Sequence, residues 1–181
     1  MVIISTLMDL PIMTEKIETG YYVGGFIFTK TPMKILGLSV SNREKDKKKW
    51  CISLKRVKTC LKEMIIIHHQ NDIVQLDQLP IFADAYLAPI PFCDFDIMDY
   101  QGGLVGTVKD TVIDEVSGTI KGFIISQGII DDLTAGYRIL PLIPSIQVEK
   151  GRMQLGEIDL DTLLLTQRGG LQKLFGIDQE N

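Results

Sequence analysis

The hydrophobic residues of this chain fall in many short runs that alternate with polar turns. Thr107 to Ile113 and Thr119 to Ser126 are rich in β-branched and aromatic residues, as strands are. Between them, Asp114 to Gly118 offers acidic and hydroxyl side chains that can bond to nearby backbone, and Gly118 can adopt a positive φ. The pattern predicts a β-hairpin with Gly118 in its turn.

Two further elements are predicted downstream. Ser145 to Val148 and Arg152 to Leu155 flank Lys150-Gly151, which indicates another hairpin. Before it, the run Leu140 to Pro144 contains Pro141, which has no N–H to donate to a neighbouring strand. We therefore expect an edge or irregular strand there, with Pro141 at a bend.

The sequence also contains an internal repeat. Four segments of the first half match four segments of the second half in the same order: Leu7–Met13 with Phe92–Met98, Tyr22–Gly24 with Leu104–Gly106, Ile35–Val40 with Ile120–Ile125, and Cys51–Val57 with Leu140–Ile146. Repetition of this kind predicts two copies of one structural unit. Within the copies, we expect bends where a small sheet curls on itself at four glycines: Gly24, Gly37, Gly106 and Gly122.

The predicted fold is mainly β, with two tandem small antiparallel β-barrels and a C-terminal helical tail. The predicted parts are a divergent first barrel (1–72), a connector (73–91), a second barrel (92–155) and the tail (156–181). In the tail, six apolar side chains fall on one helical face: Leu160, Leu163, Leu164, Leu171, Leu174 and Phe175. A helix should begin near Asp159 and Asp161 and end or kink at Gly169-Gly170. We expect its apolar face to be covered by the chain's own barrel or by a second copy of the chain in a homodimer.

Composition places the chain among globular proteins. Hydrophobic residues make up 45% and the mean hydropathy is +0.16. No run approaches the roughly 20 apolar residues of a membrane-spanning helix, and no basic region precedes Ile3 to Leu10 as it would in a signal peptide. We expect a cytoplasmic protein whose Cys51, Cys60 and Cys93 stay reduced, since their number and wide spacing suit neither a disulfide framework nor a zinc site.

Charge is distributed unevenly along the chain. Nine basic and three acidic residues lie between Asn42 and Glu63, so this segment carries +6 while the remainder carries −10 of the net −4. One interpretation is a solvated loop, and the other is a surface for RNA or another anionic partner, with an aromatic ring available for stacking. The candidate partner-binding residues of this segment are Lys45, Lys47, Lys48, Lys49, Trp50, Lys55 and Arg56.

No catalytic, metal-binding or cofactor-binding residues are predicted. His68 and His69 are adjacent, and adjacent side chains of a strand point to opposite faces, so we interpret them as structural or solvated. Asp131-Asp132 fits a loop tip better than an acid/base pair, and Gly102-Gly103 fits a turn better than a phosphate loop. We expect that the protein is not an enzyme.

The second copy resembles the PRC-barrel family. The resemblance is carried by Gly106-Thr107-Val108-Lys109-Asp110, the acidic turn up to Gly118, Gly122-Phe123 and Leu140-Pro141-Leu142. The first copy has Ile27-Phe28 in the neighbourhood of the Lys109-Asp110 pair and lacks the acidic turn. Lys109 and Asp110 are either a surface ion pair or a partner contact, and the surface they form should exist once.

The resemblance implies a docking module. Members of the family include a cytoplasmic domain of a photosynthetic reaction-centre subunit, a domain of a ribosome-maturation factor, and small bacterial proteins, some from spore-forming bacteria. It therefore implies a non-catalytic adaptor or scaffold that binds protein partners during assembly of a larger complex. The alternative is an RNA- or ribosome-associated assembly factor that uses residues 42–62.

Overall fold

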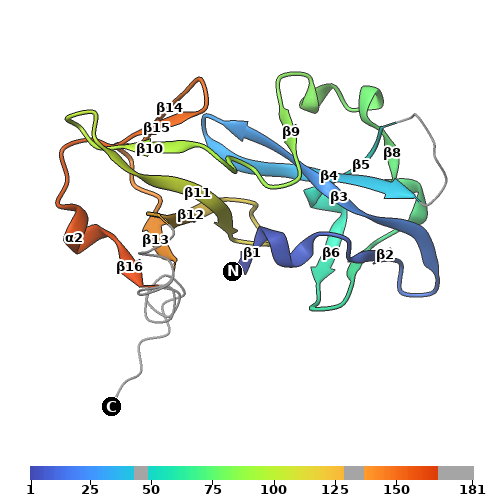
Figure 1. The fold of residues 1–181 in the computed structure, drawn as a ribbon. Coiled ribbons are helices and arrows are strands. Elements are labelled where there is room, and N and C mark those ends of the chain that lie inside the picture. Colours follow the sequence, from blue (N-terminus) through green and yellow to red (C-terminus); the bar gives the residue numbers. More distant parts are fainter. Residues whose placement is uncertain (43–48, 129–136, 167–181) are drawn as a thin grey trace, which may run out of the picture. The chain divides into compact units, whose positions relative to one another are not determined.

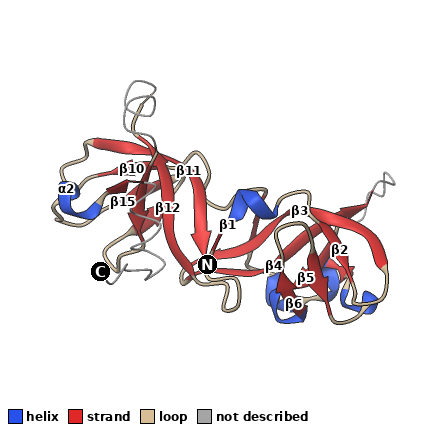
Figure 2. Ribbon diagram, turned by 90° about the horizontal axis from the view of Figure 1, so that it is seen from below, coloured by secondary structure: helices blue, strands red, loops and turns tan. Residues whose placement is uncertain are grey.

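The computed structural model of the chain describes residues 1–42, 49–128 and 137–166, and strands form most of it (Figures 1 and 2). Backbone contacts divide the chain into two units. The N-terminal unit comprises Val2–Pro91 with Asp114–Thr119, and the C-terminal unit comprises Met1, Phe92–Ile113 and Ile120–Asn181. The prediction of a mainly β fold is confirmed. No helix in the described ranges is long and apolar enough to cross a membrane.

The sheet of the N-terminal unit has the strand order β6-β7-β2-β3-β4-β5-β8, and β9 pairs with β3 (Figure 1). Its neighbours are antiparallel except for β2 and β7, which are parallel. The strands are β2 (Pro11–Met13), β3 (Glu18–Lys30), β4 (Met33–Asn42), β5 (Trp50–Ser53), β6 (Val57–Cys60), β7 (Ile65–Ile67), β8 (Val74–Gln75) and β9 (Tyr86–Ala88). The remaining elements are β1 (Val2–Ile3) and five 3-10 helices, η1 (Ile4–Leu7), η2 (Leu54–Arg56), η3 (Gln70–Asp72), η4 (Leu76–Gln78) and η5 (Pro80–Phe82).

The segment predicted as a connector, 73–91, contributes two strands to the N-terminal sheet. β8 pairs with β5, and β9 pairs with β3 along Phe26–Phe28, which is buried throughout. Between these strands, η5 brings Phe82 against buried Ile27 and Cys51. Burial of these apolar side chains stabilises the unit. The N-terminal core therefore needs chain beyond residue 72.

The sheet of the C-terminal unit has the strand order β14-β15-β10-β11-β12-β13-β16. Its neighbours are antiparallel except for β10 and β15, which are parallel. The strands are β10 (Asp96–Met98), β11 (Leu104–Ile113), β12 (Ile120–Ser126), β13 (Arg138–Pro141), β14 (Gln147–Glu149), β15 (Arg152–Gln154) and β16 (Leu165–Thr166), and the described residues also include the helix α2 (Leu160–Leu163). Both predicted hairpins, β11–β12 and β14–β15, are confirmed. In the core, Phe92 packs edge-to-face on Phe95 and Phe123, with ring centroids 5.6 Å apart in each pair.

The predicted helical tail is wrong for the part of the tail that the structure describes. The predicted helix start is close, since α2 begins directly after Asp159, but α2 is a single turn. It is followed by β16, whose Leu165 and Thr166 pair with β13. The chain beyond Leu155 therefore adds a strand to the sheet, because pairing with β13 outweighs the helical spacing of the leucines. The predicted break at Gly169-Gly170 and the apolar residues from Leu171 on lie outside the described residues.

The two sheets share one order of pairing. Each has a parallel pair beside a run of antiparallel neighbours, and each is interrupted by the same two irregularities in its central hairpin. In β3–β4 they fall between Val23 and Gly25 and after Ile27, and in β11–β12 they fall between Val108 and Asp110 and after Val112. An extra residue at such a bulge bends the strand and increases its twist. The spacing between the two bulges is the same in both hairpins.

Backbone hydrogen bonds near the first bulge also correspond. The N–H of Asp9 donates to the carbonyl of Val23 at 3.0 Å, and the N–H of Asp94 donates to that of Val108 at 2.9 Å. Asp9 and Asp94 both have positive φ, at 59° and 62°. Asp is one of the few non-glycine residues that adopt this conformation readily.

These registers correct two of the predicted matches. Gly37 faces Ser53 and Gly122 faces Pro141, so Ile52 corresponds to Leu140, and the predicted match of Cys51 with Leu140 is wrong by one residue. Ile12 faces Tyr21 and Ile97 faces Gly106, so Gly106 corresponds to Tyr21, and Gly24 corresponds to Lys109. The predicted match of Gly24 with Gly106 is therefore wrong. The dipeptide Val-Gly recurred in both strands by coincidence.

Gly37 and Gly122 are equivalent, as predicted, and the register gives the reason for both. A Cβ on Gly37 would lie 2.5 Å from the carbonyl oxygen of Ile52, and one on Gly122 would lie 2.7 Å from that of Leu140. Both glycines thus allow the next strand to approach closely. Gly106 similarly faces the carbonyl oxygen of Ser126, at 2.5 Å.

The structure tests the predictions for Gly118 and Pro141. Gly118 has φ 71°, and the Asp114 side chain before it accepts the N–H of Ser117 at 2.8 Å, so the predicted turn chemistry is confirmed. Pro141 ends β13, where it pairs with Gly122 of β12. The prediction of an edge or irregular strand for residues 140–144 is confirmed, because Leu140 and Pro141 pair with β12 on one side and the strand ends at Pro141. Among the described residues, β16 pairs with Arg138 and Ile139, which precede this run.

Candidate partner-binding surfaces

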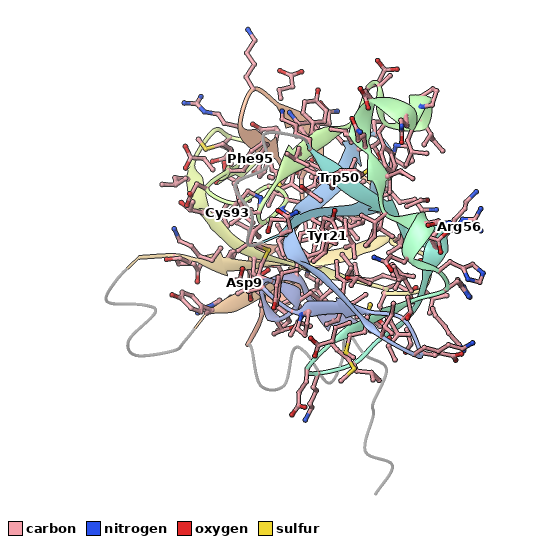
Figure 3. All side chains as sticks on the ribbon, turned by 90° about the vertical axis from the view of Figure 1, so that its right-hand side faces the viewer. Asp9, Tyr21, Trp50, Arg56, Cys93 and Phe95 are labelled. Carbon is pink, nitrogen blue, oxygen red and sulfur yellow. The ribbon has the colours of Figure 1, made fainter. Side chains whose placement is uncertain are left out.

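The basic segment is only partly within the described residues, since Lys45, Lys47 and Lys48 lie outside them. Lys49 is exposed directly before β5, while Lys55 and Arg56 are exposed in η2. Trp50 opens β5 and packs edge-to-face on Tyr21, with ring centroids 6.0 Å apart. Figure 3 shows Trp50 beside Tyr21, with Arg56 apart from both. The structure therefore does not bring Trp50 and Arg56 together as one stacking surface.

Two of the basic side chains meet carboxylates from elsewhere in the N-terminal unit. Arg56 Nε lies 3.6 Å from Asp72 Oδ1, and Lys58 Nζ donates a hydrogen bond to Glu15 Oε1. That hydrogen bond, with the charge of Lys58, lowers the pKa of Glu15 below its usual value. The positive charge of the segment is thus partly balanced across the fold. A count restricted to residues 42–63 could not include Glu15 and Asp72.

Lys109 forms an ion pair in the C-terminal unit, but its partner is not Asp110. Lys109 Nζ lies 3.3 Å from Asp94 Oδ1, and both side chains are exposed. Asp110 is buried and accepts the N–H of Thr111 at 2.7 Å. The predicted Lys109–Asp110 surface pair is therefore wrong, because adjacent residues of a strand point to opposite faces, and here Lys109 is exposed while Asp110 is buried. At the equivalent positions of β3 the chain has Gly24 and Gly25, not Ile27 and Phe28.

We expect the Lys109–Asp94 pair to contribute little to stability. Exposed ion pairs typically contribute about 0.2–1 kcal/mol, because water and side-chain entropy offset the attraction. A double-mutant cycle of Lys109→Ala with Asp94→Asn should give a coupling free energy in this range at low salt, fading at high salt. Asn is chosen because it tolerates the positive φ at position 94. A salt-independent coupling above about 2 kcal/mol would contradict this expectation.

Two grooves of the N-terminal unit lie near the basic segment. The connector groove, of about 560 Å³, is lined by Lys49, Gln75, Leu76, Asp77, Leu79, Pro80, Phe82 and Ala83. The histidine groove, of about 640 Å³, is lined by Thr14, Glu15, Lys16, Ile17, His68, His69, Gln70 and Asn71. The first includes the predicted contact residue Lys49. The second was missed from sequence, because its two walls come from segments that are far apart in the chain.

Both histidines line the same groove, which corrects the expectation that they point to opposite faces. His68 follows β7 directly, and His69 is the N-cap residue of η3. The strand has therefore ended before the alternation of faces reaches these residues. Both are exposed, as the interpretation of solvated side chains requires.

Two of the cysteines lie in strands of the N-terminal unit, and the third lies in the C-terminal unit. Burial, with a contribution from the charge of Asp77, raises the pKa of Cys51 to about 11, and burial also raises the pKa of Cys60 and of Cys93. All three are free thiols in the structure. Within the described residues no group of three or more His, Cys, Asp and Glu side chains could hold a metal ion. Asp131-Asp132 lies outside those residues.

Gly102-Gly103 forms a turn, as predicted. The side chain of Asp99 accepts the N–H groups of Gln101 and Gly103 at 2.9 and 2.7 Å, and Gly102 has φ 86°. A carboxylate that accepts from nearby backbone N–H groups in this way fixes a tight turn. These glycines therefore shape the β10–β11 connection.

The C-terminal unit provides the link to known proteins. Its strands β10 to β15 are continuous in the chain, and their order follows from the registers above. Residues 92–159 match the PRC-barrel domain family. This match begins at the first residue after Pro91 and includes Lys109, Asp110, Gly122 and Pro141, on which the resemblance rested. No curated protein matches the chain.

Proposed function

We propose that the chain is a non-catalytic adaptor that docks on protein partners during assembly of a larger complex. The observation that carries the proposal is the PRC-barrel match of residues 92–159, since this family is one of docking and assembly modules. A fold alone does not determine function, so the proposal rests on the class of domain and on the surfaces it exposes. A cytoplasmic site of action is part of the proposal.

The proposal extends to the N-terminal unit, as a second and divergent module of the same barrel type. Its support is the common strand order and the pair of bulges at equivalent positions of the two central hairpins. The divergence is local. Gly24 and Gly25 replace the Lys109–Asp110 motif, and the chain after β8 forms η4 and η5 over the core. Two related modules with different surfaces suit a protein that bridges two partners.

An RNA-associated role is the rival function. The basic segment supports it, while the pairing of Arg56 with Asp72 and of Lys58 with Glu15 weighs against it. Binding of RNA through several lysines releases counterions and therefore weakens steeply with salt. Protein docking through a mixed surface has no such requirement.

The test compares the two roles on the full chain. We expect a defined protein partner to be captured from the native cell after ribonuclease treatment, and to bind the purified chain directly. In filter binding across a salt series, we expect no saturable binding of RNA. A matched variant, Lys47→Glu with Lys48→Glu and Lys49→Glu, should leave the protein partner bound. RNA binding that falls steeply with salt and is lost in this variant would replace the adaptor proposal with the RNA-associated one.

A further inference from the structure

We infer that the histidine groove docks an acidic segment of a protein partner and holds it more tightly at mildly acidic pH than at neutral pH. This inference rests on the proposed adaptor function and specifies the chemistry of the partner. It follows from the arrangement of the two walls of the groove and from the balance of charges around it.

The first wall is the tight turn between β2 and β3. Thr14 Oγ1 accepts the N–H groups of Ile17 and Lys16 at 3.1 and 3.3 Å, and the N–H of Thr14 donates to the carbonyl of Ile17 at 3.0 Å. These bonds fix the backbone that carries Glu15, Lys16 and Ile17. A prearranged wall lowers the entropy cost of docking.

The second wall is fixed in a similar way. The N–H of His69 donates to Asp72 Oδ2 at 2.9 Å, and the N–H of Asp72 donates to the carbonyl of His69 at 3.0 Å. Asp72 also pairs with Arg56, and the N–H of His68 donates to the carbonyl of Arg56 at 3.3 Å. Both histidines thus sit on a backbone held by η2 and η3.

The charges of the groove favour an acidic partner. Glu15 is the acidic residue of its lining, and it is bonded to Lys58. Asp72, beside the second wall, faces Arg56. Since each of these carboxylates meets a basic side chain, Lys16 leaves the groove with a positive balance among the described residues.

A lower pH should increase the net positive charge of the groove. Histidine is the side chain that gains a proton between about pH 8 and pH 5. Glu15 and Lys16 from the β2–β3 turn line the groove with the two histidines. The charged groups around it are Lys58 of β6, which is bonded to Glu15, and Arg56 of η2, which is paired with Asp72 of η3. The bond to Lys58 lowers the pKa of Glu15, so this carboxylate stays ionised to a lower pH than an ordinary glutamate. Positive charge added to the imidazoles would lie beside Glu15, whose own charge is already met by Lys58.

The lining favours a polypeptide over RNA. Apart from the two imidazoles, the lining contains no aromatic ring on which a base could stack. Ile17, with 52% of its surface exposed, instead gives an apolar contact beside the charges. An acidic segment with an apolar residue next to its carboxylates fits both features.

The test measures how tightly a fluorescein-labelled peptide of eight glutamates and one leucine binds to the full chain. Binding is followed by fluorescence anisotropy at pH 5.5 and at pH 7.5. Glutamate stays mostly ionised at both pH values, so the pH dependence reports on the protein. We expect saturable binding, about three- to tenfold tighter at pH 5.5 and weaker at higher salt. Lys16→Glu should weaken it at least tenfold, and His68→Gln with His69→Gln should remove the pH dependence.

The matched control is Lys62→Glu, which makes the same charge change at an exposed site between β6 and β7, outside the groove lining. It should change the affinity less than twofold. The inference is wrong if the peptide does not saturate at either pH, if Lys62→Glu acts as strongly as Lys16→Glu, or if the pH dependence survives the histidine variant. Octauridylate that binds as tightly as the peptide would also overturn it. Failure to capture a protein partner would instead count against the adaptor function. The peptide measurements alone decide whether the groove binds an acidic segment.

Discussion

Replacing either Gly37 or Gly122 with alanine should destabilise the protein by about 3 kcal/mol. The added methyl group would approach a backbone carbonyl oxygen of the adjacent strand, to 2.5 Å at Gly37 and 2.7 Å at Gly122. A carbonyl within a hydrogen-bonded strand cannot rotate away as a flexible side chain could. The strands must separate instead, at the cost of ladder hydrogen bonds and of packing beneath them.

Gly24→Ala is the matched control for both variants. Gly24 also lies within a strand, but a Cβ there would meet Ser41 Oγ at 3.4 Å, an ordinary contact. Its effect should stay within about 0.5 kcal/mol. Urea unfolding of the three variants, followed by far-UV circular dichroism and by fluorescence of the single tryptophan, measures the differences. Equal effects at Gly24 and Gly37 would show that loss of glycine, rather than close approach of strands, is responsible.

The local parts of the fold were the parts that the sequence could predict. The β11–β12 hairpin has its strand residues, its acidic turn and Gly118 within one short continuous stretch, so the pattern contains the whole element. The alignment of Leu7–Met13 with Phe92–Met98 agrees with the two strand registers, in which Ile12 faces Tyr21 and Ile97 faces Gly106. Errors began where the decisive partner lies far away in sequence. β16 follows a helical spacing of leucines, but its pairing partner β13 lies well upstream, before the whole β14–β15 hairpin.

The candidate surfaces illustrate the same limit. Lys109 and Asp110 form a recognisable motif, but the carboxylate that pairs with Lys109 is that of Asp94, which precedes β10, and only the fold shows this pairing. The histidine groove unites the β2–β3 turn with the end of β7 through the parallel pairing of these strands. Nothing in either segment alone indicates the other. A basic run is visible in sequence, whereas the carboxylates that balance Arg56 and Lys58 are visible only in the fold.

Phe82→Ala should cause a loss of about 3–5 kcal/mol, which is typical for removal of a buried aromatic ring. Phe82 is 6% exposed and belongs to the segment between the predicted barrels. Its ring packs with Ile27 and Cys51, and the tip of the ring lies 2.9 Å from the position of a Cβ on Gly37. The variant would leave a cavity over the centre of the N-terminal sheet, where β9 and β4 flank β3.

The neighbouring residue gives a stringent control, since Ile81 is 64% exposed in the same short helix. Ile81→Ala should change stability by no more than about 0.5 kcal/mol. Unfolding should be followed by fluorescence of Trp50, because this residue lies in β5 of the same unit. If residues 73–91 were only a link between two complete modules, both variants would unfold like the parent protein. A large loss at Phe82 with none at Ile81 would instead establish that the N-terminal unit requires this segment, because its core is incomplete without the ring that η5 supplies.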